Sequence, residues 1–600
     1  MARSSIKIVG ASGQGLISIG EVLAKAFKRT GYCVFGYREY NSLIKGGHGS
    51  YQIDISDVEV RSSEEQVNVL VCLNHHGFEH NLHDVKDGGM IIHDTPSWQF
   101  PAEDVEYLQT HQIVVLFLPV GEVLGLLKAK PVLGNMVFSA FLWAAFCGDQ
   151  KLLKSLVTEK FAKKPDVLEL NMQVIDQGFM LCASMQCSLA IPKPSKAWQQ
   201  HLLLTGSQAM GMGIVSAGCR LFAGYPMTPA SPLLQYIADV QNETGMVIKQ
   251  AEDEITAAQM VSGAMFAGTR AITATSGGGF DLMSETLSLN GIIENPSVFV
   301  LAQRPGPATG LPTWTAQGDL LMAVHTAHGE FARCVMSVSD SDDAFHLMNE
   351  AFNVAEMIQS PVIVLTDKHI AEGIYTQRPY DAKKTKIARG RLVTKSSDLK
   401  KLKSTDRYDP STVDGISSRW LPGADAATFC AQGDEHSGDG TVDESAANAI
   451  AQMDKRMKKM ETLKLLIPDP EFFMLSQTGM AVSPKDQQTE LLIVGWGSNK
   501  GVIFDSIEAL NSDPALAMHP PIGYLHYSYL WPLKTDRLIR LATQTKKVVF
   551  IECSYQSQFL QLVKQEVPGF TAEVIRKYDG RPFFLNELCS LIKKQLSPAA

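Results

Sequence analysis

Apolar runs alternate with amphipathic stretches through the first part of the chain. The run from Ile6 to Ala11 (IKIVGA) predicts a strand, the glycine turn SGQG follows it, and an amphipathic helix is expected from Leu16 to Phe27. Further apolar runs (YQIDI, VNVLVCL, GMIIHD and IVVLFLPV) are separated by stretches of helix length. This alternation is typical of an open α/β domain. We predict such a domain over residues 1–190, before the linker-like sequence PKPSK.

The same alternation returns twice further along the chain. Between residues 191 and 380, the strand-like runs AITATS, SVFVLAQR and SPVIVLTD predict a second α/β domain with a largely parallel sheet. Residues 489–600 carry the runs ELLIVGWG, IGYLHYSYL and KVVFIEC with helical segments between them, and they predict a third. The chain is therefore expected to be a multidomain α/β protein.

Residues 381–488 have a different character. A lysine- and arginine-rich stretch comes first, and an acidic, glycine-rich stretch follows from Gly433 to Glu444. We predict a long, mostly irregular connection with one charged helix, from about Glu444 to Leu465. A connection of this length is usually functional or poorly ordered.

Composition and charge exclude several classes of protein. The 600 residues include 54 basic and 63 acidic side chains, a net charge of −9 that gives no reason to expect nucleic acid as a partner. The ten cysteines form no CxxC pair, so we assign no metal ligand to this chain. The longest apolar run, Val132 to Cys147, is shorter than the ~20 residues of a membrane span. With no signal peptide evident, a cytoplasmic location is expected.

The sequence GYPMTPASP, residues 224–232, forms a stiff turn between two apolar segments. Its three prolines forbid a helix interior or a central strand, because each removes an N–H donor and fixes φ. Two more loops stiffened by glycine or proline, TATSGGG and QRPGPATG, also follow strands. Since ligands of open α/β sheets collect beyond the carboxyl ends of the strands, we expect the three loops to converge on one crevice.

Three adjacent carboxylates, Glu252, Asp253 and Glu254, come where a strand ends and a helix begins. Carboxylates are favoured at a helix N-terminus by the helix dipole, so capping alone would explain them. A buried carboxylate there could instead hydrogen-bond a ring nitrogen of a ligand. The helix that follows, from Ala257 to Gly268, is rich in small residues and has the pattern of a helix that packs closely against another helix or subunit.

Two glycine-rich segments near the N-terminus leave their roles open. GASGQG lacks the third glycine of a dinucleotide-binding fingerprint, so a tight turn is the better interpretation than NAD binding. The loop IKGGH displays Lys45 and His48. It is either a solvated loop or a loop whose glycines bring Lys45 close to an anionic ligand.

The ordered set GYPMTPASP, AEDEITAAQMVSGAMFAG, TATSGGGFDLMSE, QRPGPATGLPT and QGDL resembles the alpha subunit of the thiamine-diphosphate-dependent 2-oxoacid:ferredoxin oxidoreductases. The segment with GQG and IKGGH is similar to the gamma domain of that family, and residues 489–600 resemble its transketolase-type C-terminal domain. RYDPSTVDGISSR and GDEHSGDG in the connection resemble the 2-oxoglutarate-type members most. The sequence departs from the family at Met227, usually Ile, and at Gly278, commonly Pro.

The resemblance implies roles for particular residues of the second domain. The turn with Tyr225, Pro226 and Thr228 would lie over the thiamine aminopyrimidine, and Thr228 would hydrogen-bond the 2-oxoacid. Glu254 would hydrogen-bond N1′ of the aminopyrimidine, with Glu252 as the rival position. Arg304 would point into the site, where a guanidinium suits a bidentate grip on a carboxylate.

The resemblance also implies substrate contacts from the gamma-like domain. Lys45 would reach the substrate from there, with His48 close by. A 2-oxoglutarate-type site must hold a second, remote carboxylate, so we expect this loop to supply the second cation.

The implied reaction is the oxidative decarboxylation of 2-oxoglutarate to succinyl-CoA with electrons passed to ferredoxin, or its CO₂-fixing reverse. No GDG…N motif for Mg²⁺–diphosphate occurs in a strand–helix setting, and no set of cluster-binding cysteines occurs. An obligate beta subunit is therefore expected to supply Mg²⁺, the diphosphate site and an iron–sulfur cluster, probably in an alpha2beta2 heterotetramer. Pyruvate or another 2-oxoacid as substrate, and a non-catalytic assembly role, stay open as alternatives.

Overall fold

The computed structural model describes residues 3–41, 47–477, 479–483, 485–512 and 521–596. Contacts divide the chain into two compact units, which are described here one at a time. Unit 1 comprises residues 1–204, 373–379 and 584–590, and unit 2 comprises residues 205–372, 380–583 and 591–600. The described residues form three sheets, as expected for a multidomain α/β protein.

Unit 1 is built on a mixed sheet of eight strands in the order β6-β5-β4-β1-β3-β2-β14-β7. The strands are β1 (Arg3–Ala11), β2 (Cys33–Tyr40), β3 (His48–Ser56), β4 (Val67–Cys72), β5 (Val85–His93), β6 (Val114–Phe117), β7 (Leu202–Thr205) and β14 (Ile374–Gln377). β1, β4, β5 and β6 are parallel neighbours, whereas β2 and β3 join antiparallel. The open α/β domain predicted from the sequence therefore contains antiparallel pairs as well as parallel ones.

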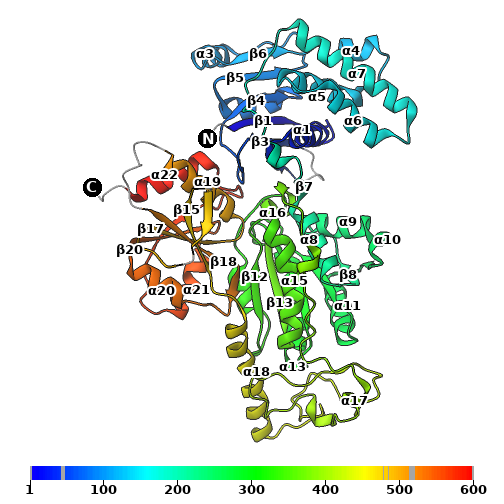
Figure 1. The fold of residues 1–600 in the computed structure, drawn as a ribbon, viewed down its shortest axis with the longest axis vertical. Coiled ribbons are helices and arrows are strands. Elements are labelled where there is room, and N and C mark those ends of the chain that lie inside the picture. The colour runs from blue at the N-terminus through cyan, green and yellow to red at the C-terminus, as the bar shows by residue number, and fades with distance from the viewer. Residues whose placement is uncertain (1–2, 42–46, 478, 484, 513–520, 597–600) are drawn as a thin grey trace. The chain divides into compact units, whose positions relative to one another are not determined.

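Helices pack on both faces of this sheet. Alternate residues of the strands enter two separate cores: Ile8 and Val71 pack with one set of helices, and Val9 and Leu70 with the other. The first set is α1 (Leu16–Thr30), α5 (Gly134–Ala145), α6 (Gln150–Phe161) and α7 (Pro165–Ser184), of which α5, α6 and α7 lie together in Figure 1. The second set includes α2 (His75–Asn81) and α3 (Ala102–Thr110).

Unit 2 contains a seven-stranded sheet in the order β19-β12-β13-β11-β10-β8-β9. Its strands are β8 (Leu221–Gly224), β9 (Val247–Gln250), β10 (Ala271–Thr275), β11 (Ser297–Gln303), β12 (Cys334–Ser337), β13 (Pro361–Asp367) and β19 (Tyr529–Trp531). All pairs are parallel except that of β19, which the C-terminal part of the chain contributes. Helix α11 (Glu254–Phe266) packs on β8 and β10, and α15 (Ser341–Ile358) packs on α8 (Gly206–Ser216).

A six-stranded sheet, in the order β16-β15-β18-β17-β20-β21, completes unit 2. Its strands are β15 (Glu471–Ser476), β16 (Gly479–Val482), β17 (Thr489–Trp496), β18 (Ile522–Tyr527), β20 (Thr545–Glu552) and β21 (Glu573–Arg576). Helices α19 (Asn499–Asn511), α20 (Asp536–Thr543), α21 (Gln558–Glu566) and α22 (Leu585–Leu596) belong to the same part of the chain. The sheet takes β15 and β16 from before residue 489, where the sequence predicts only a connection.

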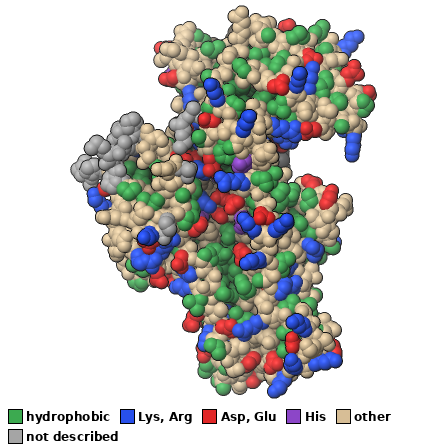
Figure 2. Space-filling model, viewed as in Figure 1, with side chains coloured by type: hydrophobic (Ala, Val, Ile, Leu, Met, Phe, Trp, Pro, Cys, Tyr) green, Lys and Arg blue, Asp and Glu red, His purple; other side chains and the backbone are tan. Residues whose placement is uncertain are grey.

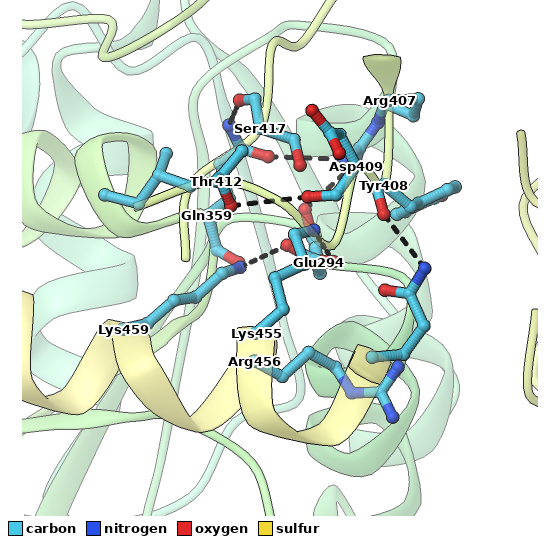
Figure 3. A network of polar contacts seen from close by, with 12 residues as sticks. Glu294, Gln359, Arg407, Tyr408, Asp409, Thr412, Ser417, Lys455, Arg456 and Lys459 are labelled. Carbon is cyan, nitrogen blue, oxygen red and sulfur yellow. Dashed lines mark hydrogen bonds and ion pairs between the residues drawn. The ribbon is translucent and has the colours of Figure 1, made fainter. Parts of the chain in front are cut away.

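The charged helix expected in the connection is confirmed as α18 (Ala446–Leu466). Its inner face is not solvated. Lys455 and Lys459 both pair with Glu294, the Lys459 ammonium at 2.6 Å, and all three side chains are 0–1% exposed (Figure 3). Arg407, in the irregular part of the connection, donates hydrogen bonds of 3.1 Å to the carbonyls of Ile293 and Glu294. Buried polar contacts therefore fix both α18 and the irregular segment.

Acidic and basic side chains are mixed over the face of the molecule seen in Figure 2. Neither sign of charge dominates this face (Figure 2).

Candidate active site

The stiff turn predicted from GYPMTPASP directly follows β8. Its backbone is closed by hydrogen bonds from the N–H groups of Ala230 and Ser231 to the carbonyl of Met227, at 2.8 and 3.1 Å. Helix α9 (Ser231–Asp239) begins at once, with Pro232 in its first turn, where proline costs no hydrogen bond. Tyr225 is 40% exposed at the start of the turn.

The three loops converge, as the sequence predicts. β8, β10 and β11 are parallel neighbours, so the loops that follow them share one edge of the sheet. Arg304, just after β11, donates a hydrogen bond of 2.6 Å to the carbonyl of Thr228. Ser276, just after β10, donates a hydrogen bond to the sulfur of Met227. This brings Thr228 and Arg304 together with the loop that contains the glycine run.

The three adjacent carboxylates after β9 have three different environments. Glu252 is exposed. Asp253 caps α11 by accepting a hydrogen bond of 2.7 Å from the backbone N–H of Thr256. Glu254 is only 4% exposed, and its Oε1 atom has no hydrogen-bond partner among the described residues. A buried carboxylate oxygen without a partner costs free energy, so Glu254 is the one of the three that is prepared for a ligand.

Gly279 allows Glu254 to approach the loop after β10. A Cβ atom at position 279 would lie 2.0 Å from Thr275 Oγ1 and 2.7 Å from Glu254 Oε1. No side chain fits there without displacing the carboxylate. A Cβ at the neighbouring Gly278 would meet nothing within 4 Å.

Asp319 also belongs to the site, although the sequence motif that contains it, QGDL, suggested no role for it. Its Oδ2 atom is buried without a hydrogen-bond partner among the described residues, and a Cβ at Gly277 would lie 3.1 Å from that atom. Burial, together with the charge of Asp281, raises the pKa of Asp319 to about 7, against the opposing effect of Arg304. Burial also lowers the pKa of the Arg304 guanidinium. The one feature of the sequence that could have indicated this site residue is its position as an acidic residue in a loop rich in glycine and proline.

The two site residues predicted in the gamma-like domain belong to unit 1. Lys45 lies outside the described residues. His48 begins β3, and its Nε2 atom lies 3.0 Å from the Asn81 amide nitrogen. Burial, together with His80, lowers the pKa of His48 to about 4, so this residue is a neutral imidazole at pH 7.

A thiamine-type cofactor fits the unit 2 site in one specific respect. The Glu254 oxygen without a partner can accept a hydrogen bond, and a protonated N1′ of an aminopyrimidine requires such an acceptor. Glu254 is therefore the residue of this site that fits the aminopyrimidine.

Family models match two parts of the chain. Residues 212–455 match the model described as pyruvate flavodoxin/ferredoxin oxidoreductase, thiamine diP-bdg, and residues 5–181 match the model described as pyruvate ferredoxin/flavodoxin oxidoreductase. The first match includes every candidate residue of the unit 2 site, and the second includes His48.

Relatives match the chain over almost its whole length. It is 31% identical to the 2-oxoacid:ferredoxin oxidoreductase subunit alpha of a Sulfolobus species, over 98% of this chain and 96% of that protein. It is 27% identical to the 2-oxoglutarate oxidoreductase subunit KorA of Mycobacterium tuberculosis, over 99% and 91%.

A solved structure agrees with these relatives. The 2-oxoglutarate:ferredoxin oxidoreductase from Magnetococcus marinus, solved with 2-oxoglutarate, coenzyme A and succinyl-CoA bound, has a TM-score of 0.87 and 28% identity over 100% of both chains. None of the described helices has the length and apolar character to cross a membrane. The predicted family is thus confirmed: the chain belongs to the 2-oxoacid:ferredoxin oxidoreductase alpha subunits.

Proposed function

We propose that this chain is the alpha subunit of an enzyme that converts 2-oxoglutarate and CoA to succinyl-CoA and CO₂. The two electrons released pass to ferredoxin, and the same site serves the reverse, CO₂-fixing reaction. The full-length likeness to a structure that holds 2-oxoglutarate, coenzyme A and succinyl-CoA supports this substrate over pyruvate. Pyruvate and other 2-oxoacids are the second candidate substrates, because some relatives are named for 2-oxoacids in general.

The unpartnered Oε1 of Glu254 is the observation that carries the proposal. When bound, thiamine diphosphate supplies the acidic carbon and the electron sink that decarboxylation of a 2-oxoacid needs. Glu254 would hold a proton at N1′ of the aminopyrimidine, and Tyr225 and Pro226 would line the ring from the preformed turn. Asp253 caps the start of α11, and the small Gly279 leaves room for the Glu254 carboxylate. The carboxylate is therefore oriented before the cofactor binds.

Arg304 and Thr228 bind the substrate end next to the reacting carbon. Arg304 already donates one hydrogen bond to the Thr228 carbonyl, and this holds its guanidinium at the turn. The remaining donors suit the carboxylate of a 2-oxoacid. Asp319 is a positioning residue: when ionised, it offsets part of the positive charge of Arg304. Lys45 stays the predicted partner of the remote carboxylate.

A beta subunit completes the enzyme. We expect it to provide Mg²⁺, the diphosphate site and the iron–sulfur cluster, in an alpha2beta2 assembly in the cytoplasm. Helix α11 exposes Ile255, Gln259 and Gly263, and its C-cap residue Ala267 is also exposed; the four are spaced four residues apart and so form one stripe. Two of these are small, which suits close packing against a partner.

An assay of the co-expressed complex tests the proposal. Reduction of ferredoxin should require 2-oxoglutarate, CoA and thiamine diphosphate together, and pyruvate should support a much lower kcat/KM. A higher kcat/KM with pyruvate would show that pyruvate, and not 2-oxoglutarate, is the substrate. Activity of a complex that lacks this chain would assign it an assembly role instead.

A further inference from the structure

A cluster of histidines and one glutamate in unit 1 has no part in the proposed reaction. Four residues of the short helix α2 belong to it: His75, His76, Glu79 and His80. Their sequence contains the spacing H-x-x-E-H, residues 76–80, which occurs on helices of zinc enzymes where two histidines bind the metal.

The docking of α2 places these side chains on one outer face. Gly77, Phe78 and Asn81 are buried, and Phe78 packs in the core beneath the helix. Asn74 caps the first turn by accepting a hydrogen bond of 2.7 Å from the N–H of Gly77. The helix is therefore anchored at both its start and its inner face, while His76, Glu79 and His80 are exposed.

Ligand atoms of His76, Glu79 and His80 lie within 4.8 Å of one another. A tetrahedral ion with bonds of ~2.1 Å needs ligand atoms about 3.4 Å apart, which exposed side chains reach by small rotations. Residues at i, i+3 and i+4 meet on a helix surface, so the backbone needs no rearrangement.

Hydrogen bonds already prepare the ligands. His80 Nδ1 lies 3.1 Å from the carbonyl of His76, which selects the tautomer with the Nε2 lone pair free. Histidine ligands of metals typically donate their second nitrogen in this way. The Glu79 carboxylate lies 3.1 Å from His75 Nδ1 and 3.7 Å from His76 Nδ1.

His48 borders the cluster from β3. Its ring centre is 5.6 Å from that of His80 and 5.8 Å from that of His76.

We propose that His76, Glu79 and His80 form a binding site for a divalent transition-metal ion, with Zn²⁺ as the representative ion. Two imidazoles and one carboxylate suit Zn²⁺, Co²⁺, Ni²⁺ or Cu²⁺ and do not suit Mg²⁺, which prefers oxygen ligands. The three ligands leave a fourth position open on the side of solvent. The site is independent of the thiamine-type site, since it needs no residue of unit 2.

Zinc titration of the full-length, chelator-treated chain tests this site, with calorimetry as the readout. One tight Zn²⁺ per chain is expected, and millimolar Mg²⁺ should not compete with it. His80→Ala and His76→Ala should each weaken that site at least ~10- to 100-fold. His111→Ala is the matched control, because His111 also pairs with a carboxylate, Asp87 at 2.7 Å, but belongs to no group of three ligating side chains among the described residues. It should leave the affinity unchanged.

Hydrogen exchange provides a second readout that separates binding from misfolding. Zn²⁺ should slow exchange of the α2 amides in the wild type and in His111→Ala, and not in His80→Ala. Without metal, the circular dichroism of all variants should be the same, because the replaced side chains are on the surface. Tight Zn²⁺ binding that survives both His76→Ala and His80→Ala would overturn the proposal. Equally weak binding in all variants would also overturn it.

Discussion

In the run Glu252-Asp253-Glu254, the position of each residue decides whether its carboxylate is exposed, caps a helix or is buried in the site. The sequence places all three carboxylates at a strand–helix junction, and capping or ligand binding would explain any of them. Which one turns inward depends on the phase in which α11 starts, and the phase is set by how α11 packs on β8 and β10. Asp319 was missed for a similar reason. An isolated acidic residue in an irregular loop has no periodicity, so its burial is a property of tertiary structure alone.

Replacing Gly279 by alanine should damage the site without unfolding the protein. The new methyl group would collide with Thr275 Oγ1 and displace the Glu254 carboxylate. We expect kcat/KM to fall by ~10²-fold, the cost of a small misplacement of a catalytic group, with a loss of ~1–3 kcal/mol in stability. Gly278→Ala is the control, since its methyl group meets nothing. Similar kinetics for the two variants would show that the close approach of Gly279 has no catalytic consequence.

The carboxyl of Asp319 should make substrate binding depend on pH. Below its pKa of about 7 it is neutral and leaves the charge of Arg304 uncompensated, and above that pH it ionises and weakens the attraction for a 2-oxoacid. The KM for 2-oxoglutarate should therefore rise roughly 2- to 5-fold as pH increases through this range. Asp319→Asn should abolish the dependence. Asp281→Asn should move its midpoint to lower pH, because the Asp281 charge helps to raise the pKa of Asp319. An unchanged pH profile in Asp319→Asn would exclude this role.

At the scale of elements, α18 is the instructive case. Its charged composition predicts a helix, and the structure has one within two residues of the expected bounds. The same composition suggests a solvated helix, yet Lys455 and Lys459 are buried against Glu294. Their partner comes from a loop more than 150 positions away, and no local pattern reveals a pairing over that distance. Secondary structure is predictable here because it is local, and burial is not.

Glu294→Gln tests how strongly this contact holds the connection. Burial opposes ionisation of Glu294, but Lys455 and Lys459 hold the pKa of its carboxyl well below the usual range. The variant leaves two buried ammonium groups without a counter-charge, so we expect a loss of ~3–5 kcal/mol in denaturant unfolding and faster hydrogen exchange in α18. Because the pKa is lowered on folding, the wild-type contribution is present above the unfolded pKa and is lost as pH falls through the folded one. Glu461→Gln, on the exposed face of α18, should change neither quantity. Equal stability of the two variants would contradict the account.

For the whole molecule, the repeated α/β pattern was sufficient to predict three sheets. It was not sufficient for the antiparallel pairing of β2 with β3, or for β19, a strand of three residues that joins a sheet built by a distant part of the chain. Short strands carry too few residues for a pattern. The convergence of loops at one sheet edge was predictable, because it follows from parallel topology alone.

Assembly with a beta subunit should depend on the exposed stripe of α11. A Cβ at Gly263 meets nothing within 4 Å, so Gly263→Arg should be tolerated by the isolated chain. In co-expression it should abolish the complex seen by size-exclusion chromatography with light scattering. Gly121→Arg is the control, because Gly121 is also an exposed helical glycine with open space around it. A stable complex with Gly263→Arg would place the partner elsewhere.

The hydrogen–deuterium exchange rate at C2 of thiamine diphosphate, measured in the assembled complex, tests the central claim most directly. Glu254→Gln keeps the size of the side chain and removes the carboxylate, so the account predicts that exchange slows by ~10²-fold or more. Glu252→Gln, two residues earlier and exposed, should exchange at the wild-type rate. An unchanged rate in Glu254→Gln, or an equal slowing in both variants, would contradict the assignment of Glu254 as the residue that activates the cofactor.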